Sequence, residues 1–262
     1  MRLHIAALSS QPEVFWVTEK RFNDACSRHP ELASRVVADW SWDLVGFERA
    51  LNVSDIVIGW RFGDLSSFRN LHQLKWIQLT GAGTEHLQPL SWLPRHITLT
   101  NNAGVHAAKL AEFAGTAILM LNHGFPHYIT HQRDSKWSKK FTTTIFGKTA
   151  LIIGLGNTGG NVAKWLKSKL GLNVIGVRRS GRAHRYADAV FTPDQLDTLL
   201  PQADFIIVTA PLTNETVDLL DRRRLSLLKP TAGLVNLGRA RIVDYDALAE
   251  FLEAGQIAGA IL

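Results

Sequence analysis

Short apolar runs alternate with helix-like stretches over the first hundred residues. Four of these runs have the length and the polar or glycine boundaries of strands, and they cover residues 3–8, 55–59, 76–80 and 97–100. Thr18 stands where it could cap a helix that extends through Arg28. Strands separated by helical segments predict βαβ units and therefore a parallel sheet.

The middle of the chain changes character after Gly104. A long helical pattern covers residues 106–121, and the stretch 123–147 that follows is less regular. That stretch contains Gly124, Pro126, a basic run and Trp137. We interpret it as a connecting arm, and a subunit interface is one hypothesis for its role.

A second set of apolar runs begins at Lys148. Strands are predicted at 149–153, 173–177, 203–209, 233–237 and 256–262, and helices at about 158–170 and 244–254. The run 149–153 is apolar without alternation, which is typical of a strand buried on both faces.

The first of these strands leads directly into Gly154-x-Gly156-x-x-Gly159. The motif has a buried strand before it, a helix after it and a second strand about twenty residues further on, which is the context of a dinucleotide-binding turn. Gly154 would permit the tight turn, Gly156 would let a pyrophosphate approach, and Gly159 would let helix and strand pack closely. Asn157 and Thr158 then lie at the helix start, where free N–H groups favour an anion.

The end of the next strand predicts which dinucleotide is bound. An NAD site usually has Asp or Glu there, whereas this chain has Arg178, Arg179 and Ser180, with Arg182 just beyond. Guanidinium groups can pair with a 2′-phosphate. We therefore expect NADP to be preferred, with NAD as the alternative.

Length and composition narrow the possibilities further. The 262 residues predict two domains, and one cysteine among them excludes a disulfide framework and a CxxC site. No apolar stretch reaches a membrane span, so we expect a soluble, cytoplasmic protein without a membrane partner. The formal charge of +6 suggests anionic ligands, but the basic residues are dispersed and no nucleic-acid motif is present, so no nucleic-acid partner is expected.

Several further motifs follow one another along the chain. They are the segments 78–87, with Gly81-Ala82-Gly83 at its centre, 102–112, 209–216, 228–239 and 242–248. In this order they resemble the D-2-hydroxyacid dehydrogenases, from about residue 55 to the last residue. The resemblance implies hydride transfer between a nicotinamide cofactor and a small 2-keto or 2-hydroxy acid, with glyoxylate or hydroxypyruvate reduction as the nearest chemistry.

The resemblance also implies an architecture and the roles of particular residues. A flavodoxin-like α/β substrate domain would cover residues 1–103, and a doubly wound Rossmann-type domain would cover 104–262; a homodimer is expected. Ala82 and Gly83 would bind the substrate carboxylate through backbone N–H groups. The further cofactor-binding candidates are Ala210, Pro211, Thr216, Leu237 and Gly238.

Arg239 is the predicted catalytic and substrate-binding residue. A planar guanidinium can hold the carboxylate and carbonyl of a 2-keto acid, and it can stabilise charge on the keto oxygen as hydride arrives. Arg239 also follows a predicted buried strand, at the edge where α/β sheets bind ligands.

The sequence departs from the family in two ways. Ala240 replaces the usual glycine after the arginine, and the family's glutamate and histidine pair would lie past Leu262. We therefore expect either a fragment or a C-terminally truncated paralogue, and a chain that binds dinucleotide but is a poor catalyst by itself. The alternative function is a catalytically impaired, redox-sensing dinucleotide-binding protein.

The histidines do not predict a metal site. His123, His127 and His131 are spaced four apart, but Gly124 and Pro126 are expected to interrupt a helix there, and no carboxylate ligand follows. His86, beside the Gly81-Ala82-Gly83 loop, is interpreted as a supporting residue and not as a general acid.

Overall fold

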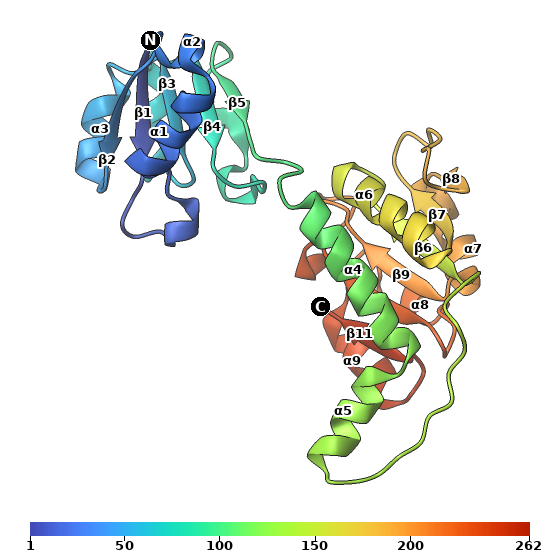
Figure 1. The fold of residues 1–262 in the computed structure, drawn as a ribbon. Coiled ribbons are helices and arrows are strands. Elements are labelled where there is room, and N and C mark those ends of the chain that lie inside the picture. Colours follow the sequence, from blue (N-terminus) through green and yellow to red (C-terminus); the bar gives the residue numbers. More distant parts are fainter. The chain divides into compact units, whose positions relative to one another are not determined.

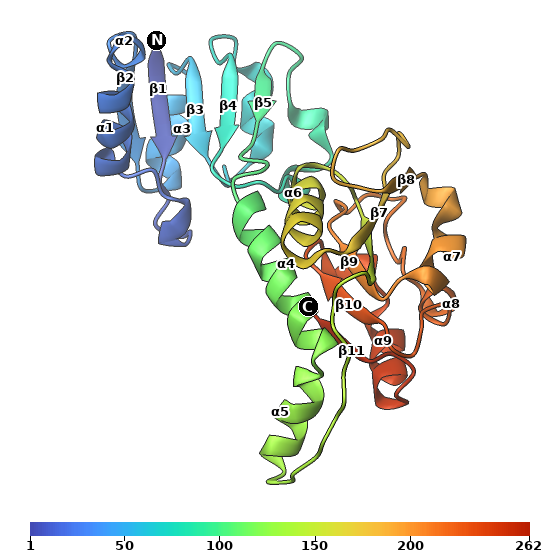
Figure 2. The ribbon, with the colours of Figure 1, turned by 45° about the vertical axis from the view of Figure 1, so that its right-hand side comes forward.

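The computed structural model describes residues 1–262 as two compact units, Met1–Val105 (unit 1) and His106–Leu262 (unit 2). Each unit is a parallel sheet with helices on both of its faces (Figures 1 and 2). The expected α/β class is therefore confirmed for both.

Unit 1 has a five-stranded sheet in the order β2-β1-β3-β4-β5. Its strands are β1 (Arg2–Ala6), β2 (Val37–Ser41), β3 (Ile56–Gly59), β4 (Trp76–Leu79) and β5 (Thr98–Thr100), and its helices are α1 (Glu19–Arg28), α2 (Pro30–Ala33) and α3 (Leu44–Leu51). This order, with the turning point between β1 and β3, is the flavodoxin-like arrangement.

Strand alternation divides the apolar side chains of unit 1 between two cores. Leu3 and Ile5 pack on the side of α1 with Phe22, whereas Val57 packs with Phe47 on the side of α3. The predicted start of α1 is confirmed, because the Thr18 hydroxyl accepts a hydrogen bond from the backbone N–H of Arg21 (3.3 Å).

Unit 2 has a six-stranded sheet in the order β11-β10-β9-β6-β7-β8. The strands are β6 (Thr149–Ile153), β7 (Asn173–Val177), β8 (Ala189–Phe191), β9 (Phe205–Val208), β10 (Gly233–Asn236) and β11 (Gly259–Ile261). Every pair is parallel. Counted from β6, this is the doubly wound Rossmann order, and the chain reverses its winding between β6 and β9.

Helices cover both faces of the second sheet. They are α4 (Ala107–Asn122), α5 (Phe125–Arg133), α6 (Asn157–Trp165), α7 (Leu196–Leu199), α8 (Arg222–Leu225) and α9 (Tyr245–Glu253). Side chains of α4 and α6 share one core with Ile152 and Ile207, and side chains of α7, α8 and α9 share the other with Leu151 and Ile206. Alternate residues of β6 and β9 therefore serve opposite cores, as the apolar run 149–153 predicts.

The structure differs from the sequence-based expectations at a few elements. The strands β2 and β8 were not predicted; both lie at sheet edges. The segment 123–147 is not irregular throughout, because it begins with α5; Pro126 lies in its first turn, where the missing N–H costs no helical hydrogen bond. The helix after the glycine motif is α-helical only to Trp165 and continues as a π-helical turn, Leu166–Leu170.

No helix in the chain combines the length and the apolar character that crossing a membrane would require.

Candidate functional site

The glycine turn between β6 and α6 is the centre of the candidate site in unit 2. Gly154 has φ +101°, a conformation that side chains rarely adopt, and a Cβ there would also collide with the backbone of Ala210. A Cβ on Gly159 would collide with the carbonyl oxygen of Gly154. Gly154 thus allows the turn, and Gly159 allows α6 to begin directly against it.

Gly156 is different, because a Cβ at this position would meet no protein atom within 4 Å. Packing within the protein therefore gives no reason for a glycine here, whereas a ligand that approaches the backbone would. Gly156 is the N-cap of α6, and no side chain caps the helix, so the N–H groups of Asn157, Thr158 and Gly159 are available to an anion. This cradle fits the pyrophosphate of a dinucleotide.

The segment after β9 braces the turn. The Thr209 hydroxyl donates to the carbonyl oxygen of Gly154 (2.8 Å), and Ala210 packs against the same glycine. Further along, the Thr216 hydroxyl donates to the carbonyl oxygen of Pro211 (2.7 Å) and accepts from the N–H of Thr213 (2.7 Å). Thr216, a predicted cofactor-binding residue, therefore holds the shape of its own loop. Ala210 and Pro211 follow β9, the strand next to β6.

The basic segment follows β7, the neighbour of β6 on the other side. Arg178 is half-buried, whereas Arg179 and Ser180 are exposed. Burial, and then the charges of Arg178 and Arg185, lower the pKa of the His184 imidazole. The His184 ring also lies against Gly160 in the first turn of α6. No acidic side chain stands at the end of β7, so positive charge dominates this part of the edge.

The turn after β10 carries the predicted catalytic residue. Leu237 and Gly238 are half-buried and Arg239 is exposed. The Asn236 side chain accepts from the N–H of Gly238 (3.0 Å) and donates to the Arg239 carbonyl oxygen (3.2 Å) and the Tyr245 hydroxyl (3.0 Å). Asn236 therefore holds the backbone from which Arg239 projects.

These four segments meet at one edge of the second sheet. Leu237 N–H donates to the Val208 carbonyl oxygen (2.9 Å), Gly154 N–H donates to that of Val177 (2.9 Å), and Gly238 lies against the carbonyl oxygen of Ala210. The structure thus gathers the predicted cofactor residues and Arg239 around the point where the winding reverses. Ligands bind at such points in open α/β sheets.

Ala82 and Gly83 belong to unit 1, where they follow β4. The Asn101 side chain donates to the carbonyl oxygen of Ala82 (2.8 Å), and the Asn102 N–H donates to that of Gly81 (3.0 Å). The N–H groups of Gly81, Ala82 and Gly83 have no acceptor within the protein. The loop is therefore held through its carbonyl groups, while its donors are free to bind a carboxylate.

The expected helix interruption among the three histidines occurs at Gly124, which has φ +71° and separates His123, the C-cap of α4, from α5. Pro126 does not interrupt the helix, because it lies in the first turn of α5, and His127 and His131 share α5 with ring centroids 4.0 Å apart. Their polar contacts are internal, since His131 Nδ1 donates to the carbonyl oxygen of His127 (2.9 Å) and His127 Nε2 pairs with the Ser138 hydroxyl (2.9 Å). Nowhere in the chain do three or more His, Cys, Asp or Glu side chains lie close enough together to hold a metal ion.

Three supporting residues were missed by the sequence analysis: Thr209, Asn236 and His184. Each acts on a segment that is distant in sequence or on the backbone of a turn, so no local motif marks Thr209 or His184. Asn236 offered a weak signal, because an Asn that ends a buried strand often bonds to the backbone two residues later.

Comparison with known proteins identifies the family. Residues 116–262 match the model of the D-isomer specific 2-hydroxyacid dehydrogenase, NAD binding domain. A glyoxylate reductase of Thermococcus gammatolerans is 32% identical over 204 residues, which are 74% of this chain and 60% of that protein. A glyoxylate/hydroxypyruvate reductase B of Pectobacterium carotovorum is 40% identical over 129 residues, 48% of this chain and 39% of that protein. The chain thus spans about 60% or less of these relatives.

Solved structures agree with the fold. A D-isomer specific 2-hydroxyacid dehydrogenase family protein from Aeromonas salmonicida superposes with a TM-score of 0.77 at 25% identity, over 99% of this chain and 80% of that one. A D-isomer specific 2-hydroxyacid dehydrogenase from Xanthobacter autotrophicus, solved in complex with NADPH and MES, has a TM-score of 0.79 at 22% identity, over 98% of this chain and 79% of that one.

Proposed function

The chain belongs to the D-isomer-specific 2-hydroxyacid dehydrogenase family, and from this premise we propose that it is an oxidoreductase that transfers hydride between NADPH and a small 2-keto acid. Glyoxylate and hydroxypyruvate are the first candidate substrates, because relatives of this chain are named as reductases of these two acids. The observation that carries the proposal is the open cradle at Gly156, which the packing of the protein does not explain. Residues 1–103 would form the substrate domain and residues 104–262 the dinucleotide-binding domain.

The dinucleotide would be held by the edge of unit 2. The free N–H groups of α6 would bind the pyrophosphate, and the segment from Ala210 to Thr216 and Leu237-Gly238 would line the nicotinamide end. Arg178 and Arg179, with Ser180, would bind a 2′-phosphate. When bound, the nicotinamide supplies or accepts the hydride.

Each unit contains candidate residues for substrate binding. The unpaired N–H groups of Ala82 and Gly83 would bind the carboxylate. The Arg239 guanidinium would stabilise the negative charge that develops on the keto oxygen as hydride reaches the carbon, and this oxygen would then take up a proton from solvent. Asn236 would position Arg239 through its backbone.

Cofactor choice is the direct test of this proposal. We expect NADPH to bind about ten- to a hundred-fold more tightly than NADH, because one charge-assisted pair contributes about 1.5–3 kcal/mol. Fluorescence titration of both cofactors measures the ratio. Arg178→Asp should reverse the preference, whereas Arg133→Asp, an exposed change in α5, should leave it intact. Equal affinities in the parent protein would refute the preference, and NADPH binding without binding of any 2-keto acid would favour the redox-sensing alternative.

We also propose that the segment 123–147 contacts a second copy of the chain in a homodimer. Trp137 and Phe141 are 89% and 94% exposed, and Phe146 is 74% exposed. Such a concentration of exposed aromatic side chains is typical of an interaction surface. Light scattering on Trp137→Ser/Phe141→Ser should then report a monomer where the parent protein is a dimer, with an unchanged NADPH affinity; a monomeric parent would disprove the homodimer.

A further inference from the structure

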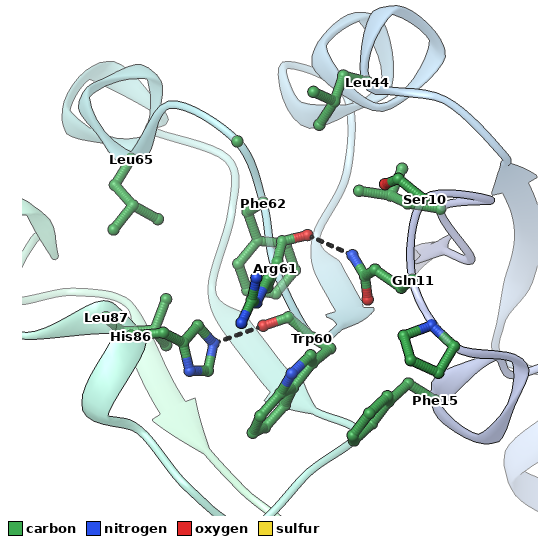
Figure 3. A pocket seen from close by; sticks show the side chains of 13 residues that line it. Ser10, Gln11, Phe15, Leu44, Trp60, Arg61, Phe62, Leu65, His86 and Leu87 are labelled. Atoms are coloured by element: carbon green, nitrogen blue, oxygen red, sulfur yellow. Dashed lines mark hydrogen bonds between the residues drawn. The ribbon is translucent and has the colours of Figure 1, made fainter.

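Unit 1 contains a pocket of about 870 Å³ at the carboxyl end of its sheet. The segments after β1 and β3 form most of it, and His86 and Leu87 complete one side (Figure 3). The winding of this sheet reverses between β1 and β3, so the pocket lies where an open α/β sheet binds ligands. Its volume is within the range of pockets that hold small molecules, and it greatly exceeds what glyoxylate, which has no side chain, would fill.

The pocket adjoins the loop that offers free N–H groups. Phe15 and Trp60 stack with their ring centroids 5.0 Å apart, and the Trp60 ring packs so closely on Gly81 that a Cβ there would overlap it. On the other side, His86 Nε2 donates to the Trp60 carbonyl oxygen (2.7 Å), which fixes His86 as part of the wall. A ligand whose carboxylate is bound at residues 81–83 therefore has Trp60 beside it and the pocket beyond.

A single charged side chain, that of Arg61, determines the charge of the pocket. Arg61 is the only Lys, Arg, Asp or Glu among the lining residues, and its guanidinium has no ion-pair or hydrogen-bond partner in the protein. The Gln11 side chain, which is 8% exposed, donates to the Arg61 carbonyl oxygen (3.1 Å) and so ties this backbone to the segment after β1. Figure 3 shows Arg61 between Trp60 and Gln11. An exposed cation in a mostly apolar pocket without acidic neighbours is suited to an anionic group.

We propose that this pocket receives the side chain of the 2-keto acid and that Arg61 selects substrates with a second carboxylate. The proposal rests on the proposed function and changes its preferred substrates from glyoxylate and hydroxypyruvate, which have a single carboxylate, to 2-keto dicarboxylic acids. The first carboxylate binds the N–H groups of residues 81–83, the carbon chain passes along Trp60, and the distal carboxylate pairs with Arg61. Gln11 and His86 position the two sides of the pocket and do not carry the charge.

The test compares two acids of equal chain length, 2-oxoglutarate and 2-oxopentanoate, by calorimetric titration of the full chain with and without NADP⁺. We expect the diacid to bind about ten-fold more tightly, as one charge-assisted pair would allow. In Arg61→Gln the ratio of the two affinities should fall to about one, and in Arg61→Lys it should be intermediate, because a point charge lacks the planar fork. Arg95→Gln, at an exposed position of unit 1 outside the pocket, should keep the parent ratio.

Each other outcome overturns a specific statement. Equal affinities in the parent protein, or no binding of either acid at millimolar concentration, would refute the role of the pocket. Equal losses for both acids in Arg61→Gln would show that Arg61 binds the first carboxylate instead. If the selectivity is found but neither NADPH nor NADH binds, the proposed function fails and the pocket assignment stands.

Discussion

Two glycines of the turn between β6 and α6 differ in what a methyl group at their position would meet. At Gly159 a Cβ would strike the carbonyl oxygen of Gly154, a backbone atom that cannot move aside. At Gly156 a Cβ would meet nothing within 4 Å. Substitutions at these two positions can therefore test the stability of the protein and its ligand binding separately.

Gly159→Ala should lower the free energy of unfolding by about 1–3 kcal/mol, as overpacking against fixed atoms does. Gly156→Ala should change it by less than about 0.5 kcal/mol, as at other positions without packing contacts, yet weaken NADPH binding by about ten-fold or more. Urea unfolding and cofactor titration of both variants measure this. A Gly156→Ala protein that binds NADPH normally would show that no ligand approaches this backbone.

Arg239 is a residue whose geometry matters more than its charge. Under the proposed mechanism, Arg239→Lys should lower kcat/KM for 2-keto acids by about a hundred-fold, because an ammonium group cannot bind the acid in two places. The NADPH affinity should change far less. Arg241→Lys, an exposed neighbour, is the control. Near-normal kcat/KM in Arg239→Lys would remove Arg239 from the site.

At the residue scale, the sequence predicted local geometry well where a single physical requirement determines which residue type can occupy a position. The Gly154–Gly159 spacing and the Thr18 cap are of that kind, and the structure bears out both local geometries. Thr209 could not be found in the same way, since its partner Gly154 is 55 residues away. Such pairings depend on which strands become neighbours, and the strand order is a property of the whole sheet.

Among the elements, every interior strand was predicted, but two of the four edge strands, β2 and β8, were not. The strands β6 and β9 are buried on both faces, so their sequences are continuous apolar runs. The edge strand β2 has exposed Val37 and Asp39 with partly buried neighbours, and the edge strand β8 has only three residues. An edge strand forms because a neighbour offers it a ladder of hydrogen bonds, and its own pattern is therefore weak.

Two short helices of unit 2 are linked by an ion pair that makes stability depend on pH. Asp197 in α7 accepts from Arg223 (2.8 Å) and Arg224 (2.7 Å) in α8. Hydrogen bonds from Arg223 and then Arg224 lower the pKa of the Asp197 carboxyl to about 2. A carboxyl whose pKa is lowered by folding stabilises the protein above its unfolded pKa, and this contribution disappears as the pH falls through the folded pKa.

We therefore expect Asp197→Asn to lower the free energy of unfolding by about 1 kcal/mol or less above pH 5, since the pair is partly exposed. The difference between parent and variant should shrink between about pH 4 and pH 2 and then vanish. Urea unfolding at a series of pH values measures this difference. A difference that stays constant down to pH 2 would mean that the charge of Asp197 is not what links α7 to α8.

At the scale of the molecule, each hydrophobic core consists of residues from one unit only. Two clusters of buried residues lie wholly in unit 1 and two lie wholly in unit 2. The predicted boundary at residues 103–104 came from a resemblance and from the turn at Gly104, and sequence alone could not show that no core spans it. Each unit has its own sheet, its own helices on both faces and its own buried clusters, which are the requirements for independent folding.

Residues 106–262 expressed alone should therefore fold and bind NADPH within about five-fold of the affinity of the full chain. The physical reason is that the glycine cradle, the basic segment after β7 and the turn after β10 all belong to unit 2, and so do the residues that brace them. A five-fold change is about 1 kcal/mol, less than one charge-assisted pair contributes. Cooperative thermal unfolding and a fluorescence titration measure the two properties, and the same fragment with Gly156→Ala is the control that should fold but bind weakly. A fragment that unfolds cooperatively yet has lost NADPH would place an essential part of the cofactor site in unit 1.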